Sequence, residues 1–250
     1  MIKVCVTSGC KGGTGKSTIS TLLTVLYAGV EKRVILIDTG TKGNCSHIIL
    51  NNPPPPYLGD VILPGNITEA ILKCEMAIGD RNVNFYLIPN NGQLPEVSSE
   101  TIERSFRKIE KYFDIAILDI PAYQNEEYYS FIDVCDIAVL VYNPNRLIIN
   151  SVSKAYTGKC VTVPVLNKYL GIEKYRNLIK EIHGKCLVVP FDPYLSLLSP
   201  ENLVNALLNL SRKTQEVLVE LALEVLKPYI GSRRREPVRS FLKIGTVLRR

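Results

Sequence analysis

The N-terminal stretch of the chain joins a short apolar run to a glycine-rich loop and then to a helix-forming segment. The apolar run covers Ile2–Thr7, the loop covers residues 8–18, and helix-compatible residues follow at 19–27. Glycines let backbone N–H groups converge on phosphate oxygens, and a helix start adds partial positive charge. This order therefore predicts a nucleotide-phosphate site between a first strand and a first helix.

Within this loop, two side chains have chemical tasks that packing does not explain. Lys16 is expected to reach the outer phosphates, and the Ser17 hydroxyl is expected to bind Mg²⁺. A turn that used glycine for geometry alone would not need lysine and serine at the helix start. The residues predicted to bind the nucleotide are Gly12, Gly13, Thr14, Gly15, Lys16, Ser17 and Thr18.

Six more apolar runs rich in β-branched residues follow along the chain. Most are continuously apolar, which is typical of strands covered on both faces of a parallel sheet. Strands alternating with helices predict an α/β fold, a doubly wound and mostly parallel sheet flanked by helices. Ligands of such sheets bind beyond the carboxyl ends of the strands. The predicted strands are 2–7, 34–37, 85–88, 115–118, 137–142, 161–166 and 186–189.

Helix-patterned stretches separate these runs. They start near Ser17, Thr68 and Glu173, and another follows a capping serine at Ser98. A last helix is predicted over residues 211–227 and is expected to end at Pro228, because proline cannot continue a helix.

Composition excludes several classes of protein. Hydrophobic residues at 46% and charged residues at 22% of 250 indicate a globular chain. No apolar run approaches the roughly 18 to 20 residues of a membrane span, and no signal-peptide pattern follows Met1, so we expect a cytoplasmic protein. The seven cysteines include no C-x-x-C pair, which favours reduced, mostly buried thiols over a zinc or iron–sulfur site.

The glycine-rich loop resembles the deviant P-loop of the ParA/MinD ATPases, which partition plasmids and chromosomes or position division sites. The first glycine of the general P-loop pattern falls on Cys10, and Lys11 matches the signature lysine of that family. In the family this lysine crosses a dimer interface to the phosphates of the other subunit. The resemblance implies ATP and Mg²⁺ as ligands, an ATP-dependent homodimer, and Lys11, Lys16 and Asp38 as catalytic residues.

Two segments with terminal aspartates extend this resemblance. Residues 34–38 look like the family's second strand, and residues 113–121 are similar to its Walker B segment. The resemblance implies that Ser17, Asp38 and Asp119 form the metal site, with Asp119 acting through water. The two aspartates also fit a simpler interpretation as loop-capping residues.

Two later segments resemble the part of the family site that holds the base. Asn167 looks like the strand-end asparagine that reads adenine, and Pro190 and Asp192 lie in a segment similar to the loop that covers the base. Asn167 equally fits an ordinary strand-end asparagine.

The segment that begins at Asp38 resembles the first switch of the family, and it departs from the family pattern at one position. The family reads Asp-x-Asp there, and its second aspartate positions or activates the attacking water, whereas this chain has Gly40. Glycine has no side chain that could orient water, so we predict tight ATP binding with slow hydrolysis. A second interpretation assigns that task to Asp38 or to a residue between 41 and 60. The pair Gly43-Asn44 still matches the switch of the partition proteins.

The last twenty residues carry the whole net charge of the chain. Between positions 231 and 250, seven basic residues stand against Glu236 alone, an excess equal to the net charge of +6. We therefore expect an electrically balanced ATPase domain at 1–230 and a basic tail at 231–250. The tail favours non-specific DNA binding. An amphipathic helix on an anionic membrane, as in MinD-type proteins, and a solubilising tail without a partner are the alternatives.

These observations favour a ParA-like nucleotide switch in DNA segregation, associated with the nucleoid and stimulated by a DNA-bound adaptor protein. A MinD-like peripheral membrane ATPase is the first alternative. A metabolic P-loop ligase or kinase is the second, and it would need acid–base residues around a substrate pocket. The chain's two histidines, His47 and His183, form no such cluster in the sequence.

Overall fold

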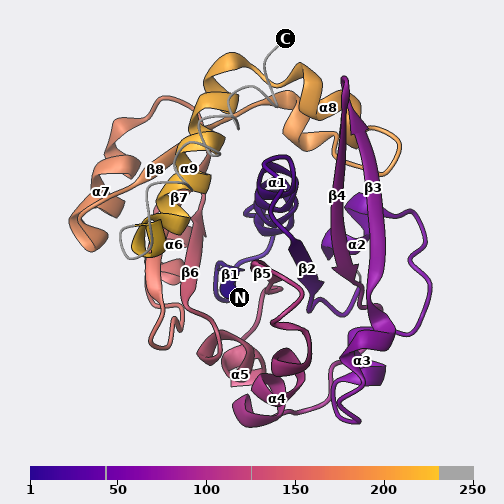
Figure 1. Ribbon diagram of the computed structural model, residues 1–250. Coiled ribbons are helices and arrows are strands. Elements are labelled where there is room, and N and C mark those ends of the chain that lie inside the picture. The colour runs from indigo at the N-terminus through magenta and orange to yellow at the C-terminus, as the bar shows by residue number, and fades with distance from the viewer. Residues whose placement is uncertain (43, 125, 231–250) are drawn as a thin grey trace.

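The computed structural model describes residues 1–42, 44–124 and 126–230 (Figure 1). Within these residues an eight-stranded sheet has the strand order β3-β4-β2-β5-β1-β6-β7-β8. Every neighbouring pair is parallel except β3 and β4. The predicted mostly parallel α/β fold and all seven predicted strands are confirmed. The strands are β1 (Ile2–Thr7), β2 (Val34–Asp38), β3 (Leu72–Ile78), β4 (Arg81–Ile88), β5 (Ile115–Asp119), β6 (Ile137–Tyr142), β7 (Val161–Tyr169) and β8 (Leu187–Pro190).

Helices cover both faces of this sheet (Figure 1). Successive strand residues point to opposite faces, so Val4 packs in the core on the α1 side and Cys5 in the core on the α4 side. One face carries α1, α2, α8 and α9, and the other carries α3 to α7. The helices are α1 (Lys16–Ala28), α2 (Asn44–Ile49), α3 (Leu58–Val61), α4 (Ser99–Ile109), α5 (Tyr129–Asp133), α6 (Arg146–Val152), α7 (Glu173–His183), α8 (Leu203–Asn209) and α9 (Arg212–Ile230).

The helix predicted from Thr68 is wrong. Only a short 3-10 turn forms there, at Ile67–Ala70, and the chain continues into the edge strand β3. Burial alternates along β3, where Cys74 and Ile78 are buried and the residues between them are exposed or half-buried. This period of two residues belongs to a strand with one covered face, and β3 pairs antiparallel with β4.

The C-terminal helix α9 does not end at Pro228, as predicted, but continues to Ile230. Proline removes one helical hydrogen bond, and this loss falls in the last turn. The buried Tyr27 of α1 donates its hydroxyl to the carbonyl oxygen of Ala222 at 2.9 Å, which joins α9 to α1.

The cysteines are unpaired, as predicted, and Cys5, Cys45, Cys74 and Cys135 are buried. None of the helices in the described ranges is both long enough and apolar enough to cross a membrane. The predicted basic and amphipathic tail, residues 231–250, and Gly43 of the Gly43-Asn44 pair lie outside the described residues.

Candidate functional site

The predicted phosphate loop curls between β1 and α1 at the carboxyl edge of the sheet. Gly13 and Gly15 have φ angles of +69° and +94°, which side chains with a Cβ rarely adopt. The loop forms the floor of a cleft of about 560 Å³. Predicted residues that line the cleft are Gly12, Gly13, Gly15, Lys16, Ser17, Thr18, Asn167, Pro190 and Asp192.

Hydrogen bonds inside the loop fix its turn. The Lys11 N–H donates to the Ser8 carbonyl at 3.2 Å, and the Ser8 hydroxyl donates to the Lys11 carbonyl at 2.5 Å. The Lys16 ammonium also donates to the Lys11 carbonyl, at 3.4 Å. Burial lowers the pKa of Lys16, and the negative charge of Asp119 opposes this effect. The loop thus holds a buried cation at the start of α1. The Thr14 hydroxyl is buried there without a hydrogen-bond partner.

Asp38 and Asp119 face each other because β2 and β5 are parallel neighbours in register at these two residues. The Asp38 carboxylate accepts hydrogen bonds from the Gly40 N–H at 2.8 Å, the Ser46 N–H at 2.9 Å and the Ser46 hydroxyl at 2.7 Å. Burial, followed by the charge of Asp119, raises the pKa of Asp38 to about 6. These bonds fix the orientation of the carboxylate.

Asp119 is fully buried, and one of its oxygens lacks a partner. The Ser20 hydroxyl donates to Oδ1 at 3.0 Å, whereas Oδ2 accepts no hydrogen bond. Burial raises the pKa of Asp119, and the Ser17 hydroxyl and the Lys16 charge oppose that rise. A buried acceptor without a partner is costly unless a ligand completes it. Carboxylate and hydroxyl oxygens near a phosphate loop are the donors that Mg²⁺ prefers, so the residues present fit this ion.

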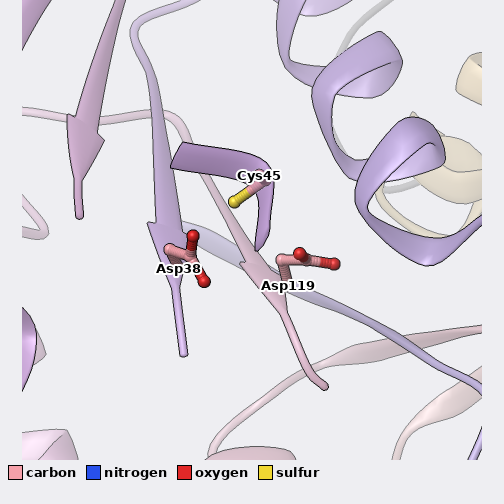
Figure 2. Close-up of side chains that lie close together, drawn as sticks. All are labelled: Asp38, Cys45 and Asp119. Carbon is pink, nitrogen blue, oxygen red and sulfur yellow. The ribbon is translucent and has the colours of Figure 1, made fainter. Parts of the chain in front are cut away.

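The sequence interpretation missed Cys45, which lies beside the two aspartates (Figure 2). One ligand atom from each of Asp38, Cys45 and Asp119 lies within 4.8 Å of the others, and all three side chains are buried. A thiol is a soft ligand, so the oxygens and not the sulfur would hold Mg²⁺. The only signal for Cys45 in the sequence was its place directly after Gly43-Asn44.

Gly40 is closely enclosed. A Cβ added there would lie 2.2 Å from Asn44 Nδ2 and 3.1 Å from Asp38 Oδ1. The Gly40 carbonyl accepts a hydrogen bond at 2.9 Å from the buried Asn90 amide, a residue that the sequence did not single out. A side chain at position 40 would therefore require the Asn44 side chain to move.

The predicted base-binding residues reach the same cleft but are already engaged. Asn167 donates its amide Nδ2 to the Thr14 carbonyl at 2.8 Å. Asp192 accepts hydrogen bonds from the Ser211 N–H at 2.9 Å and the Thr214 hydroxyl at 2.8 Å. Asp192 therefore anchors the start of α9 and contributes to the cleft wall.

The predicted site residues come from segments far apart in the sequence, yet they lie at one end of the sheet. Residues 5–199 match the family model described as the CobQ/CobB/MinD/ParA nucleotide binding domain. The chain belongs to this family. The predicted resemblance to the ParA/MinD ATPases and the predicted nucleotide-binding fold are confirmed.

Individual relatives agree with this assignment. An uncharacterized ATP-binding protein of Methanocaldococcus jannaschii is 28% identical over 211 residues, 78% of this chain and 76% of that protein. MinD of Pyrococcus horikoshii, complexed with Mg-ADP, has a TM-score of 0.71 at 23% identity and covers 93% of this chain and 99% of its own. Cyanothece McdA, in an ATP complex, has a TM-score of 0.73 at 17% identity and covers 91% of this chain and 96% of its own. At such identities the two structures establish the fold.

Proposed function

We propose that this ParA/MinD-family protein is an ATP-controlled switch that binds Mg·ATP in the cleft, dimerises in the ATP state and acts in DNA segregation. The observation that carries nucleotide binding is that Lys16 and Ser17, which line the cleft, lie next to the buried Asp119, whose Oδ2 has no hydrogen-bond partner. A buried cation and a free buried acceptor are complementary to a triphosphate with its metal ion.

The proposed roles follow from the positions of the side chains. The loop N–H groups and Lys16 would bind the phosphates, and Ser17, Asp38 and Asp119 would hold Mg²⁺. Bound Mg²⁺ would neutralise phosphate charge and polarise the reacting phosphoryl group. Asn167, Pro190 and Asp192 would form the base end of the site. Lys11, half-buried near the loop surface, would reach the nucleotide of a second copy.

Slow hydrolysis is part of the proposal. Gly40 offers no side chain to orient water, and Asn44 fills the space that a side chain would need. We expect steady-state phosphate release by the purified protein with Mg·ATP to be slow while ATP remains tightly bound. Rapid turnover that disappears in the Lys16→Met variant would contradict this part and would assign the water to another residue of the switch.

The proposed division is a switch domain at 1–230 and a cationic tail at 231–250 that attaches the ATP dimer to nucleoid DNA. The charge of the tail supports this division, since the rest of the chain is balanced. A DNA-bound adaptor would stimulate ATP turnover. The MinD-like alternative places the same tail on an anionic membrane, and its support is the relationship to MinD proteins.

Nucleotide binding is tested by replacing Lys16 with methionine. We expect ATP affinity, measured by calorimetry, to fall by at least about tenfold, because a charge-assisted hydrogen bond to phosphate is lost. Dimerisation on ATP, measured by light scattering, should be lost as well. The matched control is Lys159→Met, which removes an exposed lysine just before the amino end of β7, opposite the cleft edge. Equal ATP affinity in the two variants would contradict the proposed site.

A further inference from the structure

Two consecutive residues near the end of β7 hold two consecutive carbonyls of the phosphate loop. Asn167 Nδ2 donates to the Thr14 carbonyl at 2.8 Å, and Lys168 Nζ donates to the Gly13 carbonyl at 2.9 Å. The partners are more than 150 residues apart in the sequence. The loop is therefore held from across the cleft as well as by its own turn.

The backbone of β7 is shaped for this double contact. Side chains of consecutive strand residues normally point to opposite faces of the sheet, so two neighbours cannot both reach one loop. Here Lys168 has a φ angle of +55°, a left-handed conformation that lysine rarely adopts, and the pairing of β7 with β8 is irregular between Leu166 and Tyr169. This break in the strand allows both donors to face the loop.

The contact is also close. Asn167 is only 3% exposed, and a Cβ added to Gly15 would lie 2.3 Å from its Nδ2 atom. The absence of a side chain at Gly15 therefore lets the Asn167 amide pack directly on the loop. In a phosphate loop the N–H groups must turn toward the ligand, and donors that bind the loop carbonyls fix the orientation of the peptide units that carry these N–H groups.

We propose that Asn167 and Lys168 act as a clamp that positions the phosphate loop before nucleotide binds. Asn167 then has a task besides base recognition, and Lys168, which the sequence did not single out, becomes a positioning residue. The amide oxygen of Asn167 stays available as an acceptor for a base, so one residue would connect the base end of the cleft to its phosphate end. The effect of the clamp on the loop does not depend on the proposed function, whereas its effect on nucleotide affinity rests on that function.

The structural part is tested in the nucleotide-free full-length protein by amide hydrogen exchange. The variants are Asn167→Ala and Lys168→Met, and Lys168→Arg is the conservative variant that keeps a donor. We expect exchange in a peptide covering residues 9–17 to rise about tenfold in the first two variants and to return toward wild type in Lys168→Arg. The control is Lys42→Met, which removes an equal charge from the switch side of the same cleft. Unchanged exchange in both clamp variants would overturn the proposal.

The effect on affinity is tested with three probes: Mg·ATP, Mg·GTP and magnesium tripolyphosphate, which has no base. The clamp predicts that Lys168→Met weakens all three by about the same factor, roughly five- to tenfold. It also predicts that Asn167→Ala weakens tripolyphosphate binding. If Asn167→Ala lowers ATP affinity alone and leaves tripolyphosphate binding and loop exchange as in wild type, Asn167 only reads the base and the clamp is wrong. Failure of the wild type to bind any probe would contradict the proposed function, and the exchange experiment would still decide the clamp.

Discussion

The pair Asp38 and Asp119 shows how a local sequence pattern becomes a site with unusual electrostatics. Each residue ends a buried parallel strand, and the register of β2 and β5 brings the two carboxyls face to face. Three hydrogen bonds hold Asp38, whereas Asp119 keeps an oxygen without a partner. Burial raises the pKa values of both carboxyls, and the charge of Asp119 adds to the rise at Asp38.

This pair predicts a characteristic pH dependence of stability in metal-free, nucleotide-free protein. Burial and the charge of Asp119 raise the pKa of Asp38 from its usual 3.8 to about 6, so the folded chain binds this proton more tightly than the unfolded chain. The stabilisation is therefore complete below pH about 4 and is lost as the pH rises to about 6. Urea unfolding with EDTA across this range measures the fall, and Asp38→Asn should make it shallower, because the contribution of Asp38 is removed.

A matched control for that prediction is Asp192→Asn. Burial alone would raise the pKa of Asp192, but the hydrogen bonds from the Ser211 N–H and the Thr214 hydroxyl lower it. A lowered carboxyl pKa contributes stability that is lost only at more acidic pH. The control should therefore keep the decline between pH 4 and pH 6. A decline as steep in Asp38→Asn as in the wild type would assign it to groups other than Asp38.

At the scale of elements, the contact between α1 and α9 predicts a measurable loss of stability. The Tyr27 hydroxyl is buried and donates to the Ala222 carbonyl, so Tyr27→Phe leaves that carbonyl without this donor. We expect the free energy of unfolding, measured with urea, to fall by about 1 to 2 kcal/mol. ATP affinity should stay at the wild-type value, because Tyr27 lies in the last turn of α1, away from Lys16. Tyr112→Phe, at an exposed tyrosine, is the control.

The elements that could be predicted from sequence are those with a strong local signal. Apolar runs identified seven of the eight strands in the described residues, all except β3, and Ser98 identified the start of α4, where its hydroxyl accepts the Thr101 N–H. Strand β3 was missed because a helix was predicted to start near Thr68, although apolar residues recur at every second position over Leu72–Ile78, as in a strand with one covered face. Its identity as a strand depends on pairing with β4, which local patterns do not reveal.

The residues of the candidate site also fall into two groups, those with a local sequence signal and those without one. The phosphate loop is contiguous, and parallel strands place terminal aspartates at one edge, so its central residues were predictable. Cys45, Asn90 and Lys168 join the site through contacts with residues distant in the sequence. Lys168 also required a left-handed backbone at a non-glycine residue, which no sequence pattern signalled.

At the scale of the whole molecule, the charge distribution predicts that attachment and nucleotide binding can be separated. A chain ending at residue 230 should bind ATP as the full chain does but lose salt-sensitive binding to non-specific DNA. For seven cations, log K against log salt should have a slope of up to about −6 in the full chain. Gel shifts and liposome co-sedimentation, each with ATP and with ADP, measure the two kinds of attachment.

The outcomes of this truncation are distinct. If the full chain binds liposomes but not DNA, and the truncated chain no longer binds liposomes, the membrane alternative is favoured. Attachment that survives truncation would mean that residues 1–230, although balanced in net charge, present a cationic surface of their own.

The hydrogen bond between Tyr27 and Ala222 also connects the phosphate loop, through α1, to the C-terminal helix α9. Helix α1 starts at the phosphate loop, has 13 residues, and is therefore about 20 Å long. Its far end is bonded to α9, the helix from which residues 231–250 continue. A helix of this length is expected to move as a rigid element. Helix α1 therefore links the phosphate loop to the middle of α9, and a change at the phosphate loop could reach the C-terminal helix through this contact.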